Sequence, residues 1–393
     1  MDFAIISFKH KQMFGGNDGM RFLHTGDWHI GKNLAGYNLL ADQHATFQEI
    51  RKIAQDKQVD AVVIAGDLYD RTIPGEAAIQ ELTKELATLN IKEHLPVLAI
   101  SGNHDSATRL GIGHQWFVNN DFYLNTNFSD AFHPINIKDT QFFLLPFFGL
   151  QEVRNYFADD HIQNINTAMQ KIVTQMKESF DPQSQHVLVA HFFAAGSKRT
   201  AESETMIEVG GLSAVNTDIL KDFEYVALGH LHNKNALHEE RVRYSGSPMK
   251  LSVSEAPMEK GVWIVDTDPF EIQWVPLKPV HDIHVLEDSM DTLTNEQFAK
   301  NYAKDDYYAI KLTDREIIPD VMNRLRQYYP QILSLSRKYG FSDPKRHQQS
   351  TKTQLSPDKL FEDFFQQTIG TEMSAEQEKI MRKTLEEVMK END

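Results

Sequence analysis

Short runs rich in apolar residues recur along the first 232 residues, and each ends in a cluster of polar, ionisable side chains. The runs cover residues 21–24, 61–65, 97–100, 187–190 and 225–228, a length and composition typical of buried strands. Apolar positions at helical spacing predict helices over residues 42–55, 77–89, 164–179 and 217–222, and further strands are predicted at 241–245, 261–266 and 272–277. This alternation predicts an α/β sandwich of sheets flanked by helices.

A smaller α+β unit is predicted after this domain. Its pattern is strand 282–286, helix 295–302, strand 307–312, helix 319–328 and strand 332–337. Residues 340–356 hold Gly, Ser, Gln, Lys and Pro with few apolar residues and predict a linker, and two helices, 358–369 and 374–389, close the chain. We therefore expect a main domain at 20–277, a cap at 278–339, a linker at 340–356 and C-terminal helices within 357–393.

The two C-terminal helices carry separate signals. The first places Phe361, Phe364 and Phe365 on one face, which must be buried on a partner protein or on the rest of this chain. The second begins with Ser374 followed three residues later by Gln377, a capping-box pattern.

Residues 1–19 form no periodic element before Met20 and the first predicted strand. We expect them to be a disordered leader or an over-extended reading frame, with Met20 as the natural start. An ordinary flexible terminus is the alternative.

The composition is that of an ordinary globular chain, with 41% hydrophobic and 24% charged residues. Cysteine is absent, which excludes disulfides and thiolate metal sites and fits a reducing compartment. The longest strongly apolar stretch, residues 142–150, is too short to span a bilayer, and the amino terminus lacks a signal-peptide pattern. We therefore expect a cytoplasmic protein with no membrane contact.

The charge is unevenly spread along the chain. A formal net charge of −16 argues against a protein that coats nucleic acid through bulk electrostatics. Residues 321–352 nevertheless carry seven cations against a single Asp, interleaved with tyrosines, which predicts a surface that tracks a nucleic-acid backbone. A solvated helix face followed by a linker is the alternative. The residues concerned are Arg324, Arg326, Arg337, Lys338, Lys345, Arg346, Lys352, Tyr328, Tyr329 and Tyr339.

The five polar clusters lie where the five predicted strands end. Loops at one edge of a sheet can gather such side chains into one site. Nitrogen and oxygen donors without sulfur suit a pair of hard or borderline divalent cations better than a structural zinc. Such a pair can polarise a phosphoryl group, and a nearby imidazole can protonate the leaving oxygen. The candidate side chains are Asp27, His29, Asp67, Asn103, His104, His191, His230 and His232.

These clusters carry a family resemblance. In order, Asp-x-His, Gly-Asp-x-x-Asp, Gly-Asn-His-Asp, a lone His after a strand and Gly-His-x-His resemble the calcineurin-like metallophosphoesterases. Residues 23–32, 65–70, 225–232 and 242–248, with Ser252, resemble a narrower family, the nuclease subunits of bacterial SbcCD complexes. The resemblance covers residues 20–266 through its motifs and the remainder through its architecture. It implies a metallophosphoesterase β-sandwich flanked by helices, with a small α+β cap and C-terminal helices.

The resemblance also implies a role for each site residue. Asp27, His29 and His232 would hold one metal, Asp67 would bridge, and Asn103, His191 and His230 would complete the second position. His104 would be the catalytic imidazole, oriented by Asp70 or Asp105, with Asp70 favoured by analogy to related phosphatases. The family implies two Mn²⁺ ions, whereas the ligands alone equally admit iron, zinc or cobalt. His191 matches no fixed motif and rests on its strand-end position.

The implied function is an ATP-regulated, metal-dependent DNA nuclease in repair, replication and recombination. It would combine double-strand exonuclease with single-strand and hairpin endonuclease activity. The implied partner is an SbcC-like coiled-coil ATPase, docked by the C-terminal helices, with the nuclease dimerising through helices after the second and third motifs inside a heterotetramer. Two alternatives remain open: a metallophosphoesterase acting on a protein, nucleotide or lipid phosphate, and a non-catalytic assembly subunit with structural metals.

Overall fold

The computed structural model describes residues 19–113, 117–198 and 214–339, with short stretches at 365–366, 373–374, 376–382 and 384. Contacts divide the chain into one unit of Met1–Thr313 with Asp320–Lys338 and a second of Asp314–Pro319 with Tyr339–Asp393. The predicted leader, apart from Gly19, and the predicted linker lie outside the described residues.

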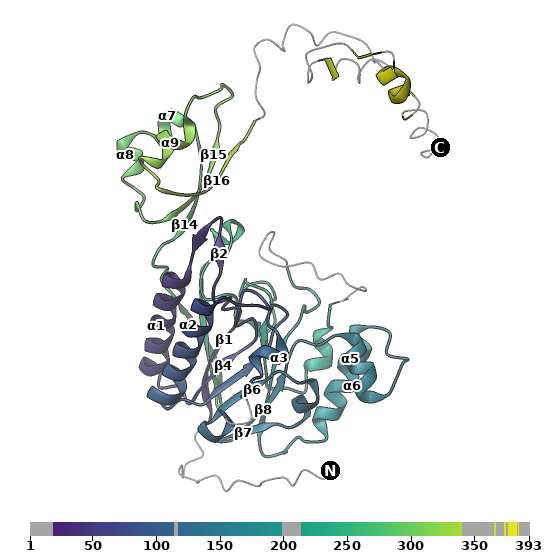
Figure 1. Ribbon diagram of the computed structural model, residues 1–393. Coiled ribbons are helices and arrows are strands. Elements are labelled where there is room, and N and C mark those ends of the chain that lie inside the picture. Colours follow the sequence, from purple (N-terminus) through teal and green to yellow (C-terminus); the bar gives the residue numbers. More distant parts are fainter. Residues whose placement is uncertain are drawn as a thin grey trace. The chain divides into compact units, whose positions relative to one another are not determined.

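Within the first unit, the part that precedes residue 278 is built on two large sheets (Figure 1). One has the order β13 (Phe270–Pro276), β12 (Gly261–Thr267), β1 (Arg21–Thr25), β4 (Ala61–Ile64), β5 (Val97–Ile100) and β6 (Phe122–Asn125). The other has the order β11 (Val242–Tyr244), β10 (Tyr225–Gly229), β9 (Gln185–His191), β8 (Thr140–Leu145) and β7 (Ile135–Ile137). Strands β1, β4, β5 and β6 run parallel, as do β8 to β11, so the carboxyl ends within each set share an edge.

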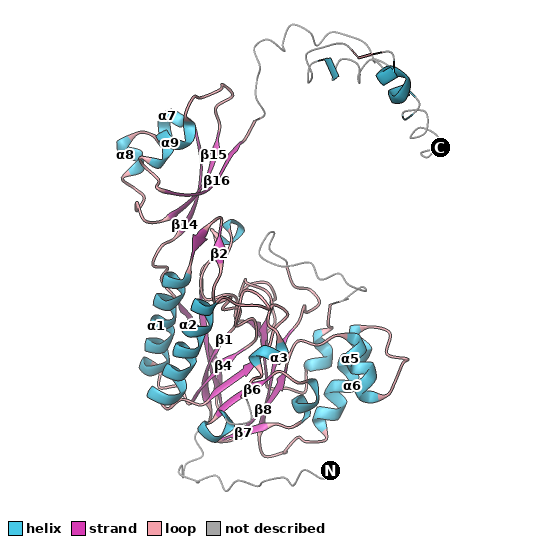
Figure 2. Cartoon of the chain, in the orientation of Figure 1, coloured by secondary structure: helices cyan, strands magenta, loops and turns pink. Residues whose placement is uncertain are grey.

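The two sheets pack face to face, with helices on their outer faces (Figure 2). Successive side chains of a strand point to opposite faces of its sheet. In β4, Val63 packs with Val189 in the core between the two sheets, whereas Val62 packs against the helices on the outer face. Helices α1 (Leu40–Asp56) and α2 (Glu76–Ala87) cover the first sheet, and α5 (Leu150–Phe157) and α6 (Ile165–Lys177) cover the second. The predicted α/β sandwich fold is confirmed.

The cap is a three-stranded parallel sheet. Strands β14 (Ile283–Asp288), β15 (Tyr307–Leu312) and β16 (Gln331–Arg337) are joined by α7 (Met290–Leu293) with α8 (Glu296–Ala299), and by α9 (Val321–Arg326). Tyr329 is fully buried, and its hydroxyl donates to the carbonyl of Leu293 at 2.9 Å. Tyr329 is therefore part of the cap core and cannot contribute to the surface that was predicted to track a nucleic-acid backbone.

Several boundaries differ from the predicted ones. The segment predicted as a helix at 217–222 is a short 3₁₀ turn, Thr217–Leu220, and α8 and α9 are shorter than the helices predicted there. The sequence pattern does not predict β6, β7, β8 or α5. The apolar run that forms β8 leads directly into Pro146, which obscures the end of that strand. The short hairpin β2 (Asn33–Leu34) with β3 (Tyr37–Asn38) and helix α3 (Ala107–Leu110) lie in loops that follow β1 and β5.

In the second unit the capping box is confirmed. Ser374 Oγ accepts from the backbone N–H of Gln377 at 3.4 Å, and Gln377 Oε1 accepts from the N–H of Ser374 at 2.9 Å. Residues 376–382 are helical, and the predicted end of this helix at 389 lies outside the described residues. Of the preceding predicted helix, only residues 365–366 are described, so Phe361 and Phe364 also lie outside them. None of the helices that the structure describes is long and apolar enough to span a bilayer.

Candidate metal centre

The predicted side chains converge where the two sheets present the carboxyl ends of their central strands. The loops after β1, β4 and β5 come from the first sheet and carry Asp27 with His29, Asp67, and Asn103. His191 ends β9, and His230 and His232 follow β10 in the second sheet. The site is therefore assembled from both layers of the sandwich.

The loops hold these residues in an uncommon backbone conformation. Asp27, His29, Asp67 and His230 all have positive φ, of 52°, 46°, 52° and 98°. Backbone bonds from Asp27 N to Gly66 O, 3.0 Å, and from His29 N to Asp67 O, 2.9 Å, join the first two loops. Left-handed backbone at non-glycine residues is costly, so its concentration here is typical of a functional site.

Glycine is required beside two of these residues. A Cβ on Gly102 would collide with the carboxylate of Asp67, and one on Gly229 would collide with the backbone oxygen of Ala65. The glycines in the Gly-Asn-His-Asp and Gly-His-x-His motifs thus leave room for the neighbouring strand ends to approach.

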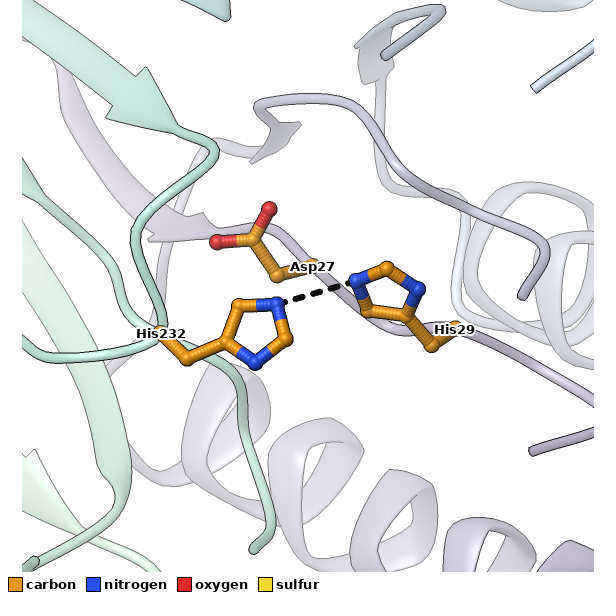
Figure 3. A group of neighbouring side chains, drawn as sticks. All are labelled: Asp27, His29 and His232. Atoms are coloured by element: carbon orange, nitrogen blue, oxygen red, sulfur yellow. Dashed lines mark hydrogen bonds between the residues drawn. The ribbon is translucent and has the colours of Figure 1, made fainter. Parts of the chain in front are cut away.

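Asp27, His29 and His232 form the first candidate ligand group (Figure 3). The Nε2 atoms of the two imidazoles face one another at 3.1 Å, near the spacing of two ligands on one ion with bonds of about 2.0–2.1 Å. Asp27 accepts from the backbone N–H of His230 through Oδ1, at 2.8 Å, and its Oδ2 is buried without a hydrogen-bond partner. That oxygen is available to a cation.

Asp67, Asn103, His191 and His230 form the second group. Asn103 Oδ1 lies 2.9 Å from His191 Nε2 and 3.0 Å from His230 Nδ1. His191 Nδ1 donates to the carbonyl of Ala65 at 2.8 Å, so its Nε2 is the atom that faces the site. Asn103 and His230 are partly exposed, whereas His191 and Asp67 are buried, so the group opens to solvent on one side only.

One oxygen of Asp67 lies between the two groups. Its Oδ1 accepts from the backbone N–H of His104 at 2.8 Å. Its Oδ2 is 3.6 Å from His29 Nε2 in the first group and 3.3 Å from His191 Nε2 in the second. A carboxylate placed in this way is suited to bridge two cations.

The ligand set fits a pair of divalent cations on grounds the structure itself provides. Five imidazole or amide donors and two carboxylates converge, and Asp27 Oδ2 is buried without a hydrogen-bond partner. Buried polar atoms are normally satisfied, so this unpartnered carboxylate oxygen indicates a need for positive charge.

His104 lies at the edge of this site, and its hydrogen bond differs from the predicted one. Its ring contacts that of His29 edge-on at 4.7 Å. Its Nδ1 lies 3.0 Å from the backbone carbonyl of Asp70, and the Asp70 carboxylate instead accepts from Lys32 Nζ at 2.9 Å. Asp105, the other candidate, accepts from the backbone N–H groups of Leu68, Tyr69 and Gly102 and thereby ties the second and third loops together.

Sequence reasoning missed Glu255. This residue is fully buried, and its Oε1 lies 3.2 Å from His232 Nδ1. Its Oε2 accepts from buried Lys260 Nζ at 2.5 Å and from Ser247 Oγ at 3.1 Å. A carboxylate that holds the far nitrogen of a ligand histidine fixes the ring and its tautomer. The sequence signal that could have pointed to Glu255 is its position shortly after residues 242–248 and Ser252, which carry part of the family resemblance.

Burial and pairing set the charges of the site without metal. Burial lowers the pKa of His29 well below its usual value and, together with the charge of His191, lowers that of His230 to about 3. Burial would also lower the pKa of His191, but the carboxylates of Asp67 and Asp27 outweigh it and raise that pKa to about 9. At neutral pH, His29 and His230 are thus neutral and His191 carries a proton.

Metal binding to the second group is therefore expected to release the proton of His191. A ligand imidazole must be neutral, so affinity should rise with pH up to about 9 and fall by up to about tenfold per pH unit below it. Calorimetric titration with Mn²⁺ in two buffers of different ionisation enthalpy measures this release. An affinity that stays constant between about pH 6 and 8 would contradict the assignment.

Replacing Glu255 with glutamine is expected to weaken metal binding by about 10–100-fold, because His232 loses its charged partner. Glu259→Gln is the matched control: Glu259 is exposed and pairs with Lys234 and Trp274. Equilibrium dialysis with metal analysis measures both variants. Equal affinities in the two would mean that Glu255 only supports the fold.

Two family profiles match the chain. One, described as calcineurin-like phosphoesterase, covers residues 20–234, more than half of the chain. The other, SbcD_C, described as the type 5 capsule protein repressor C-terminal domain, covers residues 279–368.

Curated relatives match over most of their length. The SbcD subunit of the SbcCD nuclease of Staphylococcus epidermidis is 37% identical over 321 residues, 81% of this chain and 85% of that protein. The protein of the same name from Staphylococcus saprophyticus is 32% identical over 375 residues, 94% and 99% of the two chains. Among solved structures, a dimetal phosphatase from Danio rerio aligns with 67% of this chain and 100% of its own at a TM-score of 0.40 and 12% identity, too distant to add to the assignment. The resemblance indicated by the motifs is confirmed: this chain belongs to the calcineurin-like phosphoesterases and, within them, to the SbcD family of SbcCD nuclease subunits.

Proposed function

We propose that this chain is the nuclease subunit of an SbcCD-type complex and hydrolyses DNA phosphodiesters with two Mn²⁺ ions. The observation that carries the proposal is the position of Asp67 Oδ2, within 3.6 Å of a ligand imidazole in each group. Family membership supports hydrolysis of phosphodiesters, exonuclease action on double strands and endonuclease action on single strands and hairpins. Roles in DNA repair, replication and recombination follow from the same membership.

In this proposal Asp27, His29 and His232 hold one ion and Asn103, His191 and His230 the other, with Asp67 shared. When bound, such a pair would polarise the phosphodiester and activate a water molecule. The protein's own contribution is to hold these donors on a preformed edge of the sandwich. Glu255 fixes the ring of His232, and the carbonyl of Ala65 fixes that of His191.

His104 would protonate the departing sugar oxygen. Its Nδ1 is held by the carbonyl of Asp70, so the proton given to substrate would come from Nε2. Asp70 thus acts through its main chain, while its carboxylate pairs with Lys32 and lies 3.5 Å from Arg71 Nε. His104 is partly exposed, which suits contact with a large substrate.

The assembly we propose has a cytoplasmic nuclease homodimer bound to two copies of an SbcC-like coiled-coil ATPase. Residues 20–277 would form the nuclease domain, 278–339 the cap, and 357–393 the docking helices beyond a linker at 340–356. Ile79 on α2 and Ile112 after α3 are exposed, which supports dimerisation through the helices after the second and third motifs. Arg324 and Arg326 are exposed on α9 and would contact DNA, whereas Lys338 pairs with Glu287 at 2.5 Å.

Comparing Mn²⁺-dependent cleavage of a DNA hairpin with hydrolysis of a small phosphomonoester tests the proposal. We expect rapid hairpin cleavage and little phosphomonoester hydrolysis. The opposite preference would favour a metallophosphoesterase that acts on a protein, nucleotide or lipid phosphate.

Truncation before Ser356 is expected to release the ATPase while leaving basal Mn²⁺-dependent cleavage within about twofold, because the metal ligands all precede residue 233. Co-purification of the two proteins from a co-expressing strain measures release. If the truncated chain still co-purifies with the ATPase, the docking surface lies elsewhere.

A further inference from the structure

A second cluster of ligand-type side chains lies outside the metal centre, between α1 and α2. His44 comes from α1, and Glu81 and Glu85 come from successive turns of α2, which lies beside α1 in Figure 1. One ligand atom from each of the three lies within 4.8 Å of the others. None of these residues belongs to the motifs that supply the candidate metal centre.

Glu85 is the unusual member of this cluster. Its side chain is only 1% exposed, and both carboxylate oxygens are buried without a hydrogen-bond partner. Glu85 also lines a small cavity with Trp28 and Phe47, and the polar Gln43 and Thr46 of the same lining form no hydrogen bond with it. A buried carboxylate needs a proton or a cation, and across the cluster Glu85 faces the carboxyl group of Glu81 and His44 Nδ1, the latter at 3.7 Å.

The cluster already attracts a cation. The ammonium of Lys84 lies 3.4 Å from both His44 Nδ1 and Glu81 Oε1, two of the three ligand atoms. The Lys84 side chain is 55% exposed, so it can turn toward solvent without disturbing the core. His44 and Glu81 are 36% and 15% exposed, which gives a cation from solvent access to this position.

One imidazole and two carboxylates suit a borderline divalent cation such as Zn²⁺, with solvent in the fourth position. Zinc bonds of about 2.0–2.2 Å place ligand atoms about 3.3 Å apart. The separation of 3.7 Å between His44 and Glu85 needs little change, and the 2.5 Å contact between His44 and Glu81 would open by about 1 Å.

We propose that His44, Glu81 and Glu85 form a separate site for a zinc-type divalent cation that cross-links α1 to α2. The competing explanation is a proton shared between the two carboxyl groups. Burial and the neighbouring Glu81 carboxylate raise the pKa of Glu85 to about 10, which is compatible with such sharing when no cation is present. The number of bound cations distinguishes the two explanations.

The test counts Zn²⁺ on the full-length chain by equilibrium dialysis and metal analysis. We expect His44→Gln and Glu85→Gln each to bind one equivalent less than the unsubstituted chain while keeping their Mn²⁺-dependent nuclease activity. Their thermal unfolding midpoints without metal show that both variants fold. Equal Zn²⁺ counts in the unsubstituted chain and either variant would overturn the proposal. Because the readout is bound metal, this result is independent of the proposed nuclease function.

Lys84→Ala provides a matched variant with the opposite expected effect. Removing the competing ammonium should raise the affinity of this site for Zn²⁺ several-fold, measured by titration against a chelator of known affinity. An unchanged or lower affinity would contradict the placement of the cation between His44 and Glu81.

Discussion

Replacing Asp67 with alanine is expected to remove both metals and to lower nuclease activity by about 1,000-fold or more. One oxygen of this carboxylate faces an imidazole from each ligand group, and the other accepts from the backbone N–H of His104. Metal-assisted stabilisation of a phosphoryl transfer is worth several kcal/mol, and each 1.36 kcal/mol is a factor of ten in rate. Metal analysis after dialysis, together with single-turnover cleavage of a DNA hairpin, measures both effects.

Asp222→Ala is the control for this experiment. Asp222 is a partly exposed carboxylate that pairs with Lys177 on the surface, so its loss should leave metal content and cleavage unchanged. If Asp67→Ala retained two bound metals, Asp67 would not be the shared ligand, and the two groups would have to bind their ions independently.

Replacing His104 with alanine is expected to reduce cleavage by about 10²–10⁴-fold while both metals remain bound, because it removes a proton donor and no ligand. Its ring lies beside His29, so the matched control is His161→Ala, an exposed histidine remote in sequence from every motif. Cleavage and metal content are measured on the same preparations.

The His104→Ala experiment also tests whether this chain is a catalytic subunit or a non-catalytic assembly subunit. Unchanged cleavage by the purified complex carrying His104→Ala would mean that the metals of this chain are structural. A loss of metal together with activity would instead place His104 among the ligands and remove its role as proton donor.

The convergence of the candidate metal ligands could be predicted because the position of each depends on local pattern. A short apolar run followed by Asp, Asn or His fixes where a parallel strand ends, and parallel strands share that edge. The capping box at Ser374 and Gln377 was predictable for the same reason, because both partners lie within one turn. Neither case requires knowledge of distant packing.

What could not be predicted depends on contacts between distant segments. Glu255 contacts His232 because the loop that follows β11 packs beside the end of β10. No local sequence pattern predicts this contact. The hydrogen bond of His104 goes to a main-chain oxygen, which any residue at position 70 would supply. Tyr329 lies among cations in the sequence, but its place on the inner side of the cap buries it. The left-handed backbone at Asp27 and Asp67 is likewise imposed by the loops around them.

The sharing of ligands between two sheets has a mechanical consequence. His29 and His232 come from opposite sheets of the sandwich, as do Asp67 and His191, so each proposed ion would link the two sheets. With both ions bound, the sheets could separate only if coordinate bonds broke. At a free metal concentration of 100 times the dissociation constant, each bound ion would add about 2.7 kcal/mol to the free energy of unfolding. Chelation is therefore expected to weaken the packing of the two sheets against one another and to make the interface between them accessible to proteases.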